Sequence, residues 1–403
     1  MRVFLAGCVL AAACTAREPL GHDAGANVAG NPDAGDAAVA DNPDAGGVDF
    51  PRPCPALYDD DKLPGFFVDI APDEWAALQE EYVDWDSREA MGLPQKPYHP
   101  TVFRYDDDVV ADARIRLKGN PCCSWTGPKM QFVISFNEVN PDGRFRGLRK
   151  IALDAPPYDP TYLHNRLSLA YFRRLGLPAS CANNARLFVN GEYYGLYTNI
   201  EQMDREFLER NFAEPDGDLW KYGWDLRTNE TTSSPDRRDR WWTTFDLDGM
   251  QAMADLDEIV LEWAAEAVLP HGDGYFVGSG NYYIYDHPSR GFMFLPWDMD
   301  VALDSMPYDA DPMTYRVGYG EPQQHMEAVL ADPTWRATYV AAVGRALEAY
   351  DVTTFEVWTR AWSEQIREAV RTDPSRTFNF EDHVWAVEHL RELLGRARAR
   401  GVL

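Results

Sequence analysis

The stretch ARLFVNGEYYGLYTNI, residues 185–200, decides the fold class of this chain. Two runs rich in aromatic and β-branched residues flank Asn190-Gly191, and Asn-Gly between such runs is the strongest short-range signal of a β-hairpin. Residues 201–204, Glu-Gln-Met-Asp, leave the second strand and lead to a helix expected around residues 205–211. The stretch therefore predicts a β-hairpin followed by a helix.

The part of the chain before the hairpin is rich in predicted strands. Alternating apolar and polar residues predict strands at 66–70, 101–105, 109–110, 113–117 and 131–136. A proline at an early helical position predicts a helix from Pro72, and apolar residues at helical spacing predict another over 161–175. The loop 118–129 is rich in Gly and Pro and carries a lysine at each end.

The part of the chain after the hairpin is mostly helical by the same criteria. Helices are expected at 249–268, 323–331, 334–350, 354–371 and 380–399, and one further hairpin is expected within 271–298. Strands followed by helices indicate an α+β fold. We expect a strand-rich N-terminal lobe over 51–204 and a helical C-terminal lobe over 205–403, with the functional hairpin at 271–300.

Charge and hydropathy exclude several classes of protein. The formal net charge is −27, whereas a nucleic-acid-binding protein needs a basic surface. The same charge argues against binding to anionic lipid by electrostatic attraction. Hydrophobic residues make up 45% of the chain, enough for a sizeable core. No run of eighteen apolar residues occurs, so no membrane-spanning helix is expected.

The N-terminus is typical of an exported protein. Residues 1–14 combine Arg2 with a short apolar run that ends in small residues, as in a secretory signal. Cys14 leaves a workable apolar length before it and is preferred to Cys8 as a lipidated residue. Residues 15–50 repeat Asn-Pro-Asp-Ala-Gly and hold little to bury, so a disordered linker is expected. The predicted location is the cell envelope, through a lipid anchor, or otherwise the medium; the alternative for residues 1–14 is a buried helix.

Four further cysteines, Cys54, Cys122, Cys123 and Cys181, suggest disulfides in an exported chain. Adjacent cysteines rarely pair with each other, so one or both of Cys122 and Cys123 are expected to pair with Cys54 and Cys181. No CxxC spacing occurs, which argues against a zinc site.

The hairpin within 271–298 is the candidate site. Its two strands place Asn281 near Asp298, and Asp273 enters from the loop just before. Carboxylate oxygens with an amide suit Mg²⁺ or Mn²⁺. Phosphoryl transfer needs such a metal, a carboxylate that accepts the proton of the attacking hydroxyl, and a cation on the phosphates. Asp273 could be the base and Lys118 or Lys129 the cation; the alternative is that these Asp and Asn residues only stabilise turns.

Several runs together resemble the CotH kinase family, the secreted and spore-coat atypical protein kinases. They occur in family order over residues 65 to 395: 116–120 (RLKGN), 166–176, 190–197 with Glu201 and Asp204, 273–275 with 281–283, and 296–300 (PWDMD). The resemblance implies a two-lobed, atypical protein-kinase-like fold. It also implies binding of ATP with Mg or Mn, and phosphorylation of serine or threonine on an exported or surface protein.

The resemblance also assigns roles to single residues. Asp273 resembles the catalytic aspartate, while Asp298, with Asn281 and Asp300, resembles the metal ligands. The phosphates would be contacted by Lys118 or Lys129, and residues from Glu201 to Met203 would border the nucleotide base.

Two departures from the family pattern bear on catalysis. Pro121-Cys122-Cys123 replaces the usual serines after Gly119-Asn120, and Gly278-Ser279-Gly280 lengthens the spacing between Asp273 and Asn281. The main alternative is a surface binding or structural protein that keeps the fold without catalysis, which export favours because ATP is scarce outside the cytoplasm. A metal-dependent hydrolase has less support, because no His/Asp cluster accompanies the carboxylates.

Overall fold

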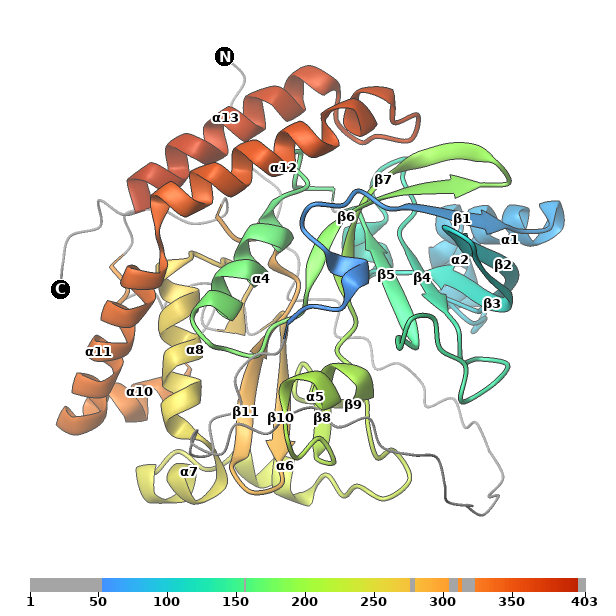
Figure 1. Ribbon diagram of the computed structural model, residues 1–403. Helices are drawn as coiled ribbons and strands as arrows, with labels where there is room; N and C mark the ends of the chain where they lie inside the picture. Colours follow the sequence, from blue (N-terminus) through green and yellow to red (C-terminus); the bar gives the residue numbers. More distant parts are fainter. Residues whose placement is uncertain (1–52, 156, 276–279, 304–310, 314–322, 398–403) are drawn as a thin grey trace, which may run out of the picture. The chain divides into compact units, whose positions relative to one another are not determined.

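The structure is a computed structural model that describes residues 53–397 except 156, 276–279, 304–310 and 314–322 (Figure 1). Residues 1–52, which include the predicted signal (1–14) and the predicted linker (15–50), lie outside the described residues. No helix within the described ranges is long and apolar enough to cross a membrane.

A closed barrel forms the first part of the described chain, with its strands in the order β1-β2-β3-β4-β5-β7-β6. Neighbouring strands are antiparallel except β1 and β6, which run parallel with Phe66 opposite Leu187. Both of these side chains are fully buried inside the barrel core. The strands are β1 (Gly65–Asp69), β2 (His99–Tyr105), β3 (Asp108–Leu117), β4 (Phe132–Ser135), β5 (Lys150–Asp154), β6 (Ala182–Val189) and β7 (Glu192–Glu201).

Short helices cover and connect the barrel strands. The helix α1 (Pro72–Val83) begins at the predicted proline and packs Trp75 edge-on against Tyr194, with ring centroids 5.3 Å apart. The remaining short elements are η2 (Ala56–Tyr58), α2 (Trp85–Ala90) and α3 (Pro121–Ser124). The predicted strands at 109–110 and 113–117 are one continuous strand, β3.

The predicted Asn190-Gly191 hairpin is confirmed by β6 and β7. Both turn residues have positive φ, 51° at Asn190 and 88° at Gly191. A two-residue turn of this kind matches the twist of the strands that it joins, and Asn and Gly tolerate it best. The Asn190 side chain also accepts a hydrogen bond from the backbone N–H of Ile70, 2.8 Å away, which ties the turn to the end of β1.

The rest of the chain is mostly helical around a small sheet in the order β11-β10-β8-β9. The predicted helix at 249–268 is two helices, because the backbone leaves helical geometry at Ala254 and Asp255, and Asp255 caps the second helix. The four predicted C-terminal helices are confirmed. The elements are α4 (His164–Arg174), α5 (Arg205–Asn211), β8 (Asp218–Lys221), β9 (Asp225–Leu226), α6 (Asp236–Trp241), α7 (Leu247–Met253), α8 (Leu256–Val268), β10 (Tyr282–His287), β11 (Gly291–Pro296), η3 (Met299–Val301), α10 (Gln324–Ala331), α11 (Pro333–Ala349), α12 (Val352–Thr372) and α13 (Phe380–Ala397).

The helix α4 shares its core with the C-terminal helices, although it precedes β6 in sequence (Figure 1). The hydroxyl of Tyr171 donates to the carbonyl of Ala346 in α11 at 3.0 Å, and its ring lies 6.0 Å from that of Phe355 in α12. The predicted fold class is thus confirmed: a sheet-rich N-terminal part is followed by a helical C-terminal part.

A disulfide joins Cys54 to Cys181, which confirms the prediction of at least one bridge. The expectation that Cys122 or Cys123 pairs with these two cysteines is wrong, because Cys54 and Cys181 bond to each other. The two segments lie side by side, since the Asn183 side chain donates to the carbonyl of Leu57 at 3.0 Å.

Candidate functional site

The β10–β11 hairpin brings together residues that are well separated in sequence. Tyr282 lies opposite Pro296, and the N–H of Trp297 donates to the carbonyl of Asn281 at 3.2 Å. Asn281, just before β10, and Asp298, two residues after β11, both have left-handed backbone, with φ of 51° and 55°. Such backbone is uncommon outside glycine and concentrates at functional sites.

Asp273 lies beside Asn281, as the hairpin predicted. The side-chain amide of Asn281 donates to Oδ2 of Asp273 at 2.7 Å, and the Tyr222 hydroxyl donates to Oδ1 of Asn281 at 3.4 Å. Partial burial, together with the negative charge of Asp298, raises the pKa of Asp273 to about 6, against the opposing effect of the Asn281 hydrogen bond. Asp273 is exposed while Asn281 is buried, so a fixed amide orients a carboxylate that solvent and ligands can reach.

Three further carboxylates gather next to this pair: Asp154, Asp298 and Asp300. Burial, followed by the charges of Asp298 and Asp154, raises the pKa of Asp300 well above its ordinary value. Among the described residues, the carboxylates of Asp298 and Asp300 have no hydrogen-bond or ion-pair partner. Their oxygens are therefore uncommitted.

Lys118 reaches the carboxylates from the end of β3. Its ammonium lies 2.9 Å from Oδ1 of Asp154, at the end of β5. Burial lowers the pKa of Lys118, but the charge of Asp154 and of the carboxylates beyond it outweighs burial and leaves the pKa raised. The Asn165 side chain links this pair to the hairpin, because it donates to Asp154 at 3.5 Å and accepts from the N–H of Met299 at 2.8 Å.

Lys221, the last residue of β8, lies at the same cluster and was not predicted. Its ammonium is 4.9 Å from the ring centroid of Tyr222 and 5.5 Å from that of Trp297. Burial lowers the pKa of Lys221 to about 7 despite the nearby charge of Asp298. Only six lysines occur in the chain, and that scarcity was the signal that could have found it. Asp154 was missed as well, although it ends a buried strand.

Lys129, the other predicted phosphate contact, is not part of this cluster. Its ammonium pairs with Asp373, between α12 and α13, and the two side chains are 1% and 0% exposed. The same ammonium lies 4.7 Å from the ring centroid of Tyr197. Burial lowers the pKa of Lys129. The structure therefore gives Lys129 a place in the packing between the barrel and the C-terminal helices.

The segment from Glu201 to Met203 joins the barrel to α5. The Glu201 carboxylate accepts from Arg210 at 2.9 Å and from the N–H of Cys181 at 2.9 Å. Met203 is 3% exposed and belongs to the C-terminal core. The side chains of Glu201 and Met203 are thus committed to packing, which leaves the backbone of this segment and the side chain of Gln202 to border a nucleotide base.

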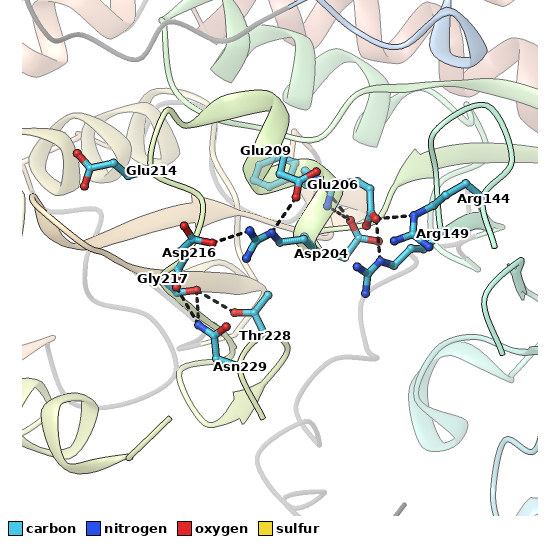
Figure 2. A network of polar contacts seen from close by, with 12 residues as sticks. Arg144, Arg149, Asp204, Glu206, Glu209, Glu214, Asp216, Gly217, Thr228 and Asn229 are labelled. Carbon is cyan, nitrogen blue, oxygen red and sulfur yellow. Dashed lines mark hydrogen bonds and ion pairs between the residues drawn. The ribbon is translucent and has the colours of Figure 1, made fainter. Parts of the chain in front are cut away.

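Charged residues fasten the end of this connection to the barrel (Figure 2). Asp204 caps α5 by accepting from the N–H of Glu206 at 3.1 Å. The Glu206 carboxylate in turn binds Nε of Arg144 at 2.8 Å and Nε of Arg149 at 2.7 Å. Both arginines lie in the segment just before β5. The start of α5 is therefore held by its own cap and by two arginines from the barrel.

The loop after Lys118 differs from the family pattern and is held by its own contacts. Gly119 has φ +90°, and a Cβ there would lie 2.7 Å from Cβ of Ser124. The Ser124 hydroxyl accepts from the N–H of Asn120 at 3.3 Å, and the Trp125 indole donates to the carbonyl of Lys118 at 2.7 Å. Ser124, the one remaining serine of the loop, thus stabilises the turn of the loop.

The donor set at the hairpin fits a divalent cation in its chemistry. Asp298 and Asp300 offer hard, uncommitted oxygens, which are the ligands that divalent cations such as Mg²⁺ prefer. Asn281 fits less well, because its amide already binds Asp273 and Tyr222. Within the described ranges, no three His, Cys, Asp or Glu side chains are placed to hold a metal ion together.

A barrel that supplies a lysine, joined to a helical part that supplies clustered aspartates, defines a kinase-like protein. The chain matches the CotH kinase protein family over residues 115–247 and 247–400, and it belongs to that family. It is 35% identical over 82 residues to inner spore coat protein H of Bacillus subtilis (strain 168), which covers 20% of this chain and 22% of that protein. It is 33% identical over 64 residues to the inner spore coat protein H-like protein of the same organism, which covers 16% and 21%. The matches span about a fifth of the length of these curated relatives.

Two solved structures show weaker likeness. One is the Shewanella oneidensis MR-1 toxin–antitoxin complex of HipA, HipB and operator DNA, with 15% identity, coverage of 62% of this chain and 57% of that chain, and a TM-score of 0.32. The other is the Helicobacter pylori proinflammatory kinase CtkA, with 10% identity, coverage of 70% and 96%, and a TM-score of 0.30. At these scores neither adds to the assignment, which stands on the family match.

Proposed function

We propose that this protein is a metal- and ATP-dependent phosphotransferase that phosphorylates serine or threonine on an exported or surface protein. The observation that carries the proposal is the Asp273–Asn281 pair beside the uncommitted carboxylates of Asp298 and Asp300. Membership of the CotH kinase family supports it. The acidic composition favours a polypeptide over a nucleic acid as partner, and residues 1–14 favour export with a lipid anchor at Cys14.

Each group at the site has a role in this proposal. Asp273, exposed and oriented by Asn281, accepts the proton of the acceptor hydroxyl. Asp298 and Asp300 would hold Mg or Mn, and a bound ion would neutralise charge on the phosphates. Lys118, held by Asp154, faces the same cluster with its positive charge. The backbone between Glu201 and Met203 is the proposed border of the nucleotide base.

Replacing Asp273 tests the proposal. Asp273→Asn keeps the shape of the side chain and removes the base, so phosphoryl transfer should fall by about 10²–10⁴-fold. Affinity for Mg-ATP should change by less than about tenfold, because a base acts in the transition state. Transfer is measured with labelled ATP, Mg²⁺ or Mn²⁺ and candidate acceptors, and affinity by calorimetry. Asp107→Asn, in the exposed β2–β3 turn, is the matched control.

Other outcomes assign the site differently. Loss of Mg-ATP binding together with transfer would place Asp273 among the metal ligands. A parent protein without transfer under either metal would favour the non-catalytic surface protein. That alternative draws on the altered loop after Gly119, where Ser124 already serves the turn.

A further inference from the structure

Lys221 differs from Lys118, Lys129 and Lys150 because its ammonium is not paired with a carboxylate of the described residues. Lys118 pairs with Asp154 and Lys129 with Asp373, and Lys150 lies 2.9 Å from Glu138. Lys221 is half-buried, and among the described residues no carboxylate lies within ion-pair distance of it. A cation that is removed from water without a partner is costly, so such a group is suited to an anion that arrives from outside.

Aromatic rings hold this ammonium in place. The rings of Tyr222 and Trp297 lie 4.9 Å and 5.5 Å from it, within the range of cation–π attraction. Lys221 pairs with Tyr283 in the sheet, so its backbone is fixed beside the hairpin that carries Asn281 and Asp298. The position of the charge is therefore set before any ligand binds.

Lys221 and Lys118 are linked through the same carboxylate. Each lysine feels the charge of Asp298, and the two ammonium groups repel each other. Lys118 comes from the barrel, whereas Lys221 comes from the C-terminal sheet. An anion between the two parts of the molecule would meet one cation from each part.

We propose that Lys221 binds the phosphate groups of the nucleotide from the C-terminal sheet, opposite the contact made by Lys118. This inference rests on the proposed function, because it takes the ligand to be a nucleoside polyphosphate. A structural role as counter-ion of Asp298 is the competing explanation, but a counter-ion would lie within ion-pair distance of that carboxylate.

Calorimetry on the full chain with two probes, Mg-ATP and adenosine, tests the inference. Lys221→Met keeps the apolar stem on the Trp297 ring and removes the charge. Loss of a charge-assisted contact should weaken Mg-ATP binding by about 10- to 100-fold and leave adenosine binding unchanged. Lys221→Arg should retain most of the affinity for Mg-ATP. Lys62→Met, at a lysine that is 56% exposed, should change neither affinity.

A second measurement needs no variant. Acetylation of the parent protein with an amine-reactive ester, followed by peptide mass spectrometry, should modify Lys221 in the free protein. Mg-ATP should protect Lys221 from acetylation, and adenosine should not. This readout keeps the inference testable if Lys221→Met does not fold.

The outcomes separate the inference from the function on which it rests. Parent-like Mg-ATP affinity in Lys221→Met, or acetylation of Lys221 that Mg-ATP does not reduce, overturns the inference alone. An equal loss of Mg-ATP and adenosine affinity indicates a structural role and overturns it too. A parent protein that binds neither probe overturns the proposed function and the inference with it.

Discussion

The buried Lys129–Asp373 pair gives the sharpest prediction about stability. Replacing Asp373 with Asn should destabilise the fold strongly, because it leaves the Lys129 ammonium buried without a counter-ion. The pair joins the segment before β4 to the end of α12, and both side chains are almost fully buried. After the change, the rings of Tyr197 and Tyr162, at 4.7 Å and 5.4 Å, would remain near the charge, but no carboxylate of the described residues would.

The magnitude follows from the burial of the pair. Removing one partner of a buried ion pair costs about 3–5 kcal/mol. The unit from residue 50 to residue 403 has about 350 residues, and an unfolding entropy of about 2.1 cal/mol/K per residue converts this loss into about 4–7 °C in Tm. Lys129→Met should cost less, because Asp373 keeps its hydrogen bonds from the N–H groups of Leu196 and Ser375, at 2.8 Å and 2.9 Å.

Urea unfolding of the parent, both single variants and the double variant measures this directly. The double variant should be more stable than the sum of the single losses predicts, because it leaves no buried charge unpaired. Mg-ATP affinity, measured well below the unfolding transition, should be the same in Lys129→Met and in the parent. A loss below about 1 kcal/mol for Asp373→Asn would refute the argument from burial. A selective loss of Mg-ATP affinity in Lys129→Met would indicate that Lys129 contacts the phosphates of the nucleotide.

Three further predictions concern the metal, the disulfide and pH. Asp298→Asn should weaken ATP binding by calorimetry only when Mg²⁺ is present, since a metal ligand acts through the ion; an equal loss in EDTA would contradict that role. Replacing Cys54 and Cys181 with Ser should lower the free energy of unfolding by about 2–5 kcal/mol, because the bridge closes a separation of 127 residues, and a reductant should then have no further effect. Hydrogen bonding to Glu81 outweighs burial and raises the pKa of His99. The protonated His99 side chain therefore stabilises the fold fully below the unfolded pKa of about 6.5, and this stabilisation is lost as pH rises through the folded pKa. As pH rises from about 6 through the raised folded pKa, the parent should therefore lose more unfolding free energy than His99→Gln, and parallel pH profiles would contradict this.

Local signals predicted most of the fold. The Asn190-Gly191 turn, the proline at the start of α1 and the apolar periodicity of the C-terminal helices each depend on neighbours in sequence. The break between α7 and α8 was not predicted, because the apolar spacing of a helix continues across it. Asp255 can cap α8 only if the backbone before it leaves helical geometry, and the sequence does not show that it does.

The sequence predicted which site residues lie together when one hairpin and its adjacent loop carry them. It did not predict this when the residues come from elements that are distant in sequence. Asn281 and Asp273 come from one hairpin and the loop before it, so sequence alone placed them together. Asp154 and Lys221 arrive from β5 and β8, and nothing local shows that these strands end at the same point. Lys129 was predicted as a phosphate contact but pairs elsewhere, and the sequence did not show this because its partner, Asp373, lies 244 residues further along the chain.

The parallel pairing of β1 with β6 sets the order in which the barrel can form. Ile70 bonds to Asn190 across 120 residues of chain, so the barrel closes only after a long loop has been brought together. Contacts so distant in sequence slow folding, because the entropy of closure precedes the stabilisation that pairing brings. Without β6 and β7, the strands β1 to β5 would lack the partners that close the barrel at β1 and β5, and unpaired edge strands can pair with another chain. An isolated barrel therefore needs the chain through Glu201. During synthesis the barrel cannot close until β6 and β7 have been made.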